Sequence, residues 1–163
     1  MHLPCNCEPV EVHDTEFVAR ALYFEFHVRR DNQLKWQAFQ AAWGTDRLSL
    51  MRTACMTCHE CKAKAKDLSD VKKEYRGFAL LHTGSIRLAG FKVEDSRSVY
   101  CGHAHISLGF TAIRGVNGEP PHPSVRLQQQ DIGKKLMELS TCRIDTNPDP
   151  QDWPEEVEWL PGE

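Results

Sequence analysis

The segment from Tyr100 to Ala112 alternates apolar and polar side chains with a regularity that constrains the fold. Successive side chains of a β-strand point to opposite faces of its sheet, so this pattern predicts a strand with one buried face. The apolar face consists of Tyr100, Ala104, Ile106, Leu108, Phe110 and Ala112. The polar face consists of Cys101, His103, His105, Ser107 and Thr111. The chain must therefore build a sheet that buries the first set, while the second set offers imidazole, thiol and hydroxyl groups to a site.

The remaining patterns predict an α+β fold with a small antiparallel sheet of three to five strands and two or three packed helices. Short connections rich in Gly, Ser and Asp separate the β-leaning runs, which favours antiparallel pairing. The other β-leaning runs are 47–54, 77–82 and 86–93, and the expected helices are 34–43, 58–73 and 124–139. In the first of these helices, Trp36, Phe39 and Trp43 share one face and are expected to pack in the core.

A length of 163 residues fits one domain with a short appendage. Residues 1–14 are expected to be irregular, residues 15–144 to form a globular α+β domain, and residues 145–163 to form an acidic tail. The tail has seven acidic residues and neither Lys nor Arg, which leaves a net charge of +4 on residues 1–144. A charge this small over that length makes nucleic-acid binding only the third functional hypothesis.

Two features bear on where such a chain would reside. No apolar run approaches the roughly 20 residues that a membrane-spanning helix needs, and the first residues have no apolar leader. Seven cysteines, an odd number, favour reduced thiols or metal ligands over a disulfide framework. We therefore expect a cytoplasmic protein that has no membrane partner.

The cysteines gather between residues 55 and 61, and three interpretations of them stay open. Zinc prefers four Cys or His ligands in a tetrahedron. These would come from Cys55, Cys58, Cys61 or His59, completed by Cys5 and Cys7 near the start of the chain. Thr57 and Glu60 have the spacing of a helix capping box, so Cys58 and Cys61 can instead belong to a buried helical stripe. Cys58 would then lie in the first helical turn, where the helix dipole can activate a thiol.

The histidine pair on the polar face of the strand offers a second site. His103 and His105 are two residues apart, so both imidazoles can reach one metal ion, with an acid such as Asp95 or Glu94 assisting. Such a centre would make the protein a metal-dependent hydrolase of phosphoester or peptide bonds. Without a metal, His105 and Ser107 can serve in acid–base catalysis or in anion binding.

The acidic tail carries Trp153, Trp159 and Leu160, an arrangement that can dock on a protein partner because aromatic anchors dominate interfaces. The sequence thus favours a small accessory protein that acts by binding, with a structural zinc ion as its candidate cofactor and no cofactor as the alternative. The metal-dependent hydrolase is the alternative.

Overall fold

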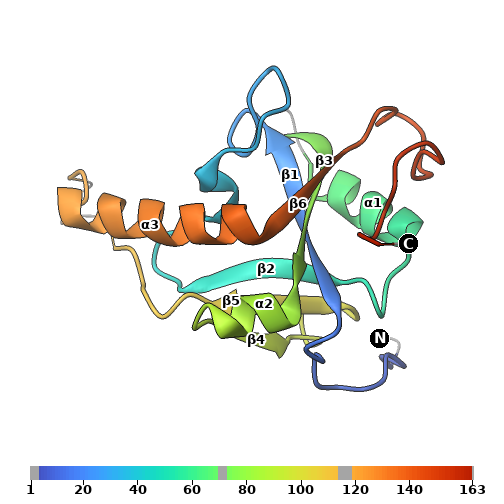
Figure 1. Cartoon of the computed structure of the whole chain (residues 1–163), viewed down its shortest axis with the longest axis horizontal. Coiled ribbons are helices and arrows are strands. Elements are labelled where there is room, and N and C mark those ends of the chain that lie inside the picture. Colours follow the sequence, from blue (N-terminus) through green and yellow to red (C-terminus); the bar gives the residue numbers. More distant parts are fainter. Residues whose placement is uncertain (1–3, 70–72, 114–118, 163) are drawn as a thin grey trace.

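The computed structural model describes residues 4–69, 73–113 and 119–162. In these ranges the chain forms an antiparallel sheet of six strands in the order β4-β5-β2-β1-β3-β6, packed with three α-helices and one 3₁₀ helix (Figure 1). The elements in chain order are β1 (Phe17–Phe24), η1 (Trp36–Phe39), β2 (Arg47–Arg52), α1 (Cys58–Asp67), β3 (Glu74–His82), α2 (Thr83–Leu88), β4 (Lys92–Asp95), β5 (His103–Ser107), α3 (Pro123–Leu139) and β6 (Ser140–Ile144).

The expectation of three to five strands is wrong, since the described residues include six. Two strands account for the difference. β1 has an aromatic sequence that suits a helix as well as a strand, and the polar strand β6 begins immediately after α3 with no turn residues between them. The β-leaning run at 86–93 is divided between α2 and β4, and the expected helix at 34–43 is a single turn, η1.

The sheet is buried on both faces along β1 and β3, and β1 shows how its sequence achieves this. Val18 and Leu22 pack toward α3, whereas Ala19 and Tyr23 pack toward α1. This alternation follows from the two-residue period of a strand. Figure 1 shows α3 and α1 on opposite sides of β1, β3 and β6. The N-terminus of α1 is the capping box expected from the sequence, with Thr57 Oγ1 accepting a hydrogen bond from the Glu60 amide at 3.1 Å.

A buried ion pair fastens the segment after β6 to α1. Lys62 and Asp145 have fully buried side chains, and the Lys62 ammonium lies 2.9 Å from the Asp145 carboxylate. The same ammonium donates hydrogen bonds to the backbone carbonyls of Asn147 and Asp152. Trp153 follows directly and is 4% exposed, packed against Phe78. The acidic tail therefore completes the core beside α1.

The N-terminal segment is bound to the opposite end of the sheet. The Arg52 side chain is fully buried and pairs with Glu16 at 2.6 Å and Asp95 at 2.8 Å. Arg52 also donates hydrogen bonds to the carbonyls of Pro9 and Val10. None of the helices in the described ranges is both long enough and apolar enough to cross a membrane.

Candidate functional site

The histidines of β5 lie on the face of the sheet that the alternating pattern predicts, but both are buried. His103 is 7% exposed and His105 is 5% exposed. His103 Nδ1 shares a hydrogen bond of 2.5 Å with Ser96 Oγ, and the ring makes an edge contact with Tyr100. Nε2 of His105 has no hydrogen-bond partner among the described residues, and Glu94 Oε2 lies 3.7 Å away. Desolvation by burial lowers the pKa of both imidazoles, which favours their neutral forms.

Asp95, the expected catalytic acid, lies on the other face of the sheet. The register pairs it with Ala104, whereas Glu94 pairs with His105, and directly opposed residues share a face. Its carboxylate is held by Arg52 at 2.8 Å and Arg97 at 2.9 Å. Burial raises the pKa of Asp95, but hydrogen bonds from these two arginines outweigh burial and leave the pKa below its usual value. Asp95 therefore does not lie beside the histidines, contrary to the placement expected from the sequence.

Ser107 is on the same face as His105 but at the end of β5. It is half-buried and lies opposite Arg47 in β2 and Lys92 in β4. The two histidines thus share their face of the sheet with Glu94 and Ser107, whereas Asp95 lies on the other face.

The cysteines expected to form one cluster occupy three different environments. Cys5 and Cys7 form disulfides with Cys101 and Cys55, respectively. Cys61 lies on the buried face of α1, and desolvation raises the pKa of its thiol to about 12. Half-buried Cys58 begins α1.

The remaining expected metal ligand is engaged elsewhere. Nδ1 of His59 accepts a hydrogen bond of 2.8 Å from the Trp153 amide. With the disulfides formed, no group of three or more His, Cys, Asp or Glu side chains in the described ranges is arranged to hold a metal ion.

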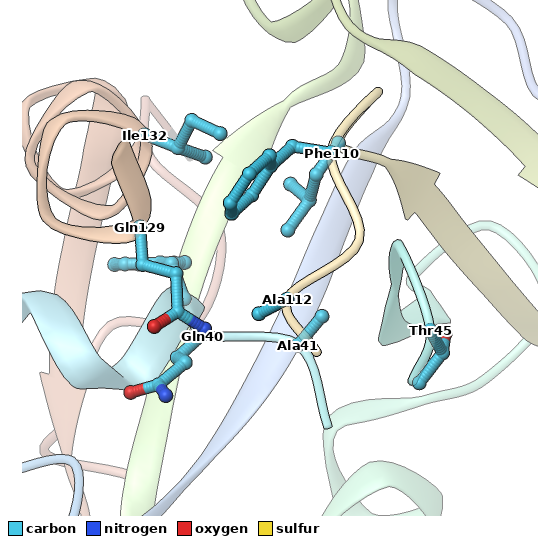
Figure 2. Close-up of a pocket in the computed structure, with 9 residues that line it drawn as sticks. Gln40, Ala41, Thr45, Phe110, Ala112, Gln129 and Ile132 are labelled. Carbon is cyan, nitrogen blue, oxygen red and sulfur yellow. The ribbon is translucent and has the colours of Figure 1, made fainter. Parts of the chain in front are cut away.

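A cleft between η1 and α3 offers a different kind of site, which we call the glutamine cleft. Its outer part has a volume of about 200 Å³ and is lined by Trp36, Gln37, Gln40, Trp43, Pro121, Arg126 and Gln129. Its inner part, shown in Figure 2, shares Gln40 and Gln129 with the outer part and is otherwise lined by Phe39, Ala41, Thr45, Leu108, Phe110, Ala112 and Ile132. The inner part has a volume of about 10 Å³, roughly the space of one water molecule.

Two amide groups stand where the inner and outer parts meet. Gln129 is 8% exposed as a residue, its side-chain amide makes no hydrogen bond to any described residue, and its amide atoms are not fully buried. The Gln40 amide likewise has no partner within the described part of the chain. Figure 2 shows the two amide ends at the same edge of the pocket, with the Gln129 amide directed toward Gln40. Both amides face the open cleft, so their donors and acceptors are accessible to a ligand.

The helix α3 and the turn η1 hold this arrangement in place. Arg126, Gln129 and Ile132 are spaced three apart on α3 and so share one face. Gly133, on the same face, lets η1 approach closely. A Cβ atom there would lie 2.7 Å from the Trp36 carbonyl oxygen and 2.9 Å from its ring. The missing side chain at Gly133 thereby sets Trp36 at the wall of the cleft.

The chemistry of the outer lining is neutral and aromatic, apart from one cation. The lining includes two tryptophans, three glutamines and Arg126, with no carboxylate, thiol or imidazole among the described residues. Arg126 is exposed and forms no ion pair within the described ranges. Such a surface can stack on a planar ring, pair with polar groups on the edge of that ring, and attract an anion at its mouth.

The glutamine cleft could not be predicted from the sequence because its lining residues come from three separate segments. Trp36 and Trp43 are half-buried walls, whereas Phe39 alone of the expected aromatic stripe is fully buried. The spacing of Arg126 and Gln129 was visible as one helical face, but two polar residues on an amphipathic helix resemble its solvent side. The distinguishing fact is that Gln129 is buried, and burial is known only once the helix is packed.

Comparisons of the chain with protein-family models, with curated proteins and with solved structures found no match.

Proposed function

We propose that this protein binds a small ligand with a nucleobase-like ring in the glutamine cleft, and that binding rather than catalysis is its biochemical role. The observation that carries the proposal is the Gln129 amide, which is 8% exposed and has no hydrogen-bond partner among the described residues. The amide atoms of Gln129 are not fully buried, so they face the open cleft and can hydrogen-bond to water in the free protein. A ligand that pairs with this amide would replace that water.

A nucleobase matches the lining better than a sugar does. A glutamine amide can form two hydrogen bonds with the edge of adenine, and tryptophan stacks on the faces of bases. Trp36 and Trp43 provide that aromatic surface, and Arg126 is placed at the mouth for a phosphate. The volume of about 200 Å³ is small for a ligand site, which suits one ring system.

The lining also supports binding over turnover. The residues that line the outer part include no group that titrates near neutral pH and no activated nucleophile. The hydrolase hypothesis is less well supported, since Asp95 lies across the sheet from the buried His103 and His105 and is held by two arginines. A protein partner on the acidic tail is also less well supported, because Trp153 is 4% exposed in the protein's own core.

The test is a titration of the protein with adenosine, cytidine, guanosine and uridine and their 5′-monophosphates, followed by tryptophan fluorescence. We expect saturable binding of at least one nucleoside, and several-fold tighter binding of its monophosphate. Arg126→Gln should remove the preference for the monophosphate and leave nucleoside binding unchanged. Lys134→Gln, another change at an exposed cation of α3, is the matched control.

Glucose and maltose serve as competing probes. Binding of either sugar without any nucleoside binding would refute the nucleobase assignment. Failure of all these ligands to bind would refute the proposed function itself.

A further inference from the structure

The four cysteines of the two disulfides lie at one junction of the fold. The Cα atoms of Cys5 and Cys101 are 5.1 Å apart, and those of Cys7 and Cys55 are 5.3 Å apart. A single residue separates Cys5 from Cys7, so their Cα atoms are within about 7 Å. A Cβ atom on Gly102, the neighbour of Cys101, would lie 3.6 Å from Cys55 Cβ. The four cysteines therefore lie in one cluster.

Contacts other than the disulfides also hold the junction together. Cys55 follows β2 and Cys101 precedes β5, and these strands pair with each other. The Arg52 amide also donates a hydrogen bond of 2.8 Å to the Gly102 carbonyl, which ties the two turns together.

The N-terminal segment is held to the same place by arginines. Arg52 binds the carbonyls of Pro9 and Val10, and Arg97 donates a hydrogen bond of 3.1 Å to the carbonyl of Cys7. These contacts involve no sulfur atom. Reduction of the disulfides would therefore leave four thiols close together on a preformed frame.

We propose that the reduced thiols of Cys5, Cys7, Cys55 and Cys101 bind one Zn²⁺ ion in a structural site. Four thiolates in a tetrahedron form a closed zinc site of the structural type. This ligand set replaces the one expected from the sequence. Cys61 is buried in the core with its thiol held neutral by desolvation, and His59 is engaged with Trp153.

The chemistry balances with a thiol or phosphine reductant. Each S–S bond takes up two electrons from the reductant and two protons from solvent, giving two thiols. On binding Zn²⁺ the four thiols release four protons and form four Zn–S bonds. A sulfur atom in a disulfide cannot act as a thiolate ligand, so the oxidised and zinc-bound states exclude each other. A reducing compartment such as the cytoplasm, which keeps thiols reduced, would favour the zinc-bound state.

The experiment begins with full-length protein reduced by a phosphine and freed of metal under anaerobic conditions. Titration with ZnCl₂ against a chromophoric chelator should give one zinc per chain. Titration with CoCl₂ should give the absorption spectrum of a tetrahedral cobalt tetrathiolate, which reports the number of sulfur ligands in the unmutated chain.

Variants then identify the ligands. Cys101→Ser and Cys7→Ser should each weaken zinc binding by at least about a hundredfold, since loss of even an outer-shell partner costs 10- to 100-fold. Cys142→Ser, on the distant strand β6, should bind zinc as the unmutated chain does. Should Cys101→Ser fail to fold, the cobalt spectrum of the unmutated protein still decides the question. Absence of stoichiometric zinc binding, a cobalt spectrum without four thiolates, or full binding by Cys101→Ser would each overturn the proposal.

Discussion

Replacing Gln129 by leucine tests the glutamine cleft through two opposite effects, on stability and on binding. Leucine keeps an apolar bulk of similar size and removes the amide that lacks a hydrogen-bond partner among the described residues. A fully buried polar group without a partner costs about 1–3 kcal/mol, whereas the Gln129 amide atoms keep some contact with water. Gln129 borders a cleft open to water, so the lower end applies, and we expect the free energy of unfolding to rise by about 1 kcal/mol.

Both effects can be measured on the same preparation. Urea unfolding should show the gain in stability, and the melting temperature should rise by about 2–4 °C for a chain of this length. In the nucleoside titration, affinity should fall about tenfold, which corresponds to the loss of roughly 1.4 kcal/mol of hydrogen bonding. Gln128→Leu is the matched control, because Gln128 is the exposed neighbour on the same helix and does not line the cleft.

The two measurements also distinguish an amide that is already hydrogen-bonded from one that does not face the ligand. A loss of stability of 1 kcal/mol or more in Gln129→Leu would show that the amide already makes a stabilising hydrogen bond. Unchanged ligand affinity would show that the amide does not face the ligand. Either result, if absent from Gln128→Leu, refutes the assignment of Gln129 as the centre of the site.

Three further predictions concern the frame that holds the sites. Lys62→Met leaves the Asp145 carboxylate buried without its cation, so the free energy of unfolding should fall by about 3–5 kcal/mol, and a loss below 1 kcal/mol in urea unfolding would contradict this. Asp95→Asn removes a carboxylate bound to buried Arg52 and should cost roughly 1–3 kcal/mol at pH 7. The folded-state pKa of Asp95 is lowered, so its contribution is present above the unfolded pKa of about 3.9 and is lost as pH falls through the folded pKa. The difference between this variant and the unmutated chain should therefore shrink below pH 4, and a difference independent of pH would count against the charge explanation. Gly77→Ala should be severely destabilising in thermal melts, because Gly77 has φ +148° and a Cβ there would collide with a carbonyl of β6; an unchanged melting temperature would contradict the packing.

The sequence predicts local features well where one segment determines them. Thr57 caps α1 as its spacing indicates, and the side chains of His103 and His105 fall on one face of β5. These outcomes depend on the strand period and on one capping hydrogen bond, both of which are encoded within a few residues.

Features that depend on packing could not be predicted in the same way. The sequence places Asp95 near the histidines, but only the register shows that it faces the other side of the sheet. The glutamine cleft is assembled from η1, the segment after β5, and α3, and nothing local distinguishes the buried Gln129 from its exposed neighbour Gln128. Cys101 was absent from the expected ligands because its proximity to Cys5 arises from a contact 96 residues apart in sequence.

The sheet also has one weakly paired boundary, between β1 and β2. The ladder between β1 and β2 pairs only Val18 with Arg52 and Ala19 with Met51, whereas β1 pairs with β3 along its whole length. Beyond that short ladder, the Arg20 guanidinium spans the opening by donating to the Ser49 carbonyl at 3.1 Å and the Ala38 carbonyl at 2.9 Å. The strand trios β4-β5-β2 and β1-β3-β6 are thus joined to each other by a ladder of only two residue pairs. A force that pulls β1 away from β2 would have to break few backbone hydrogen bonds. We therefore expect the two trios to separate before the strands within either trio lose their pairing.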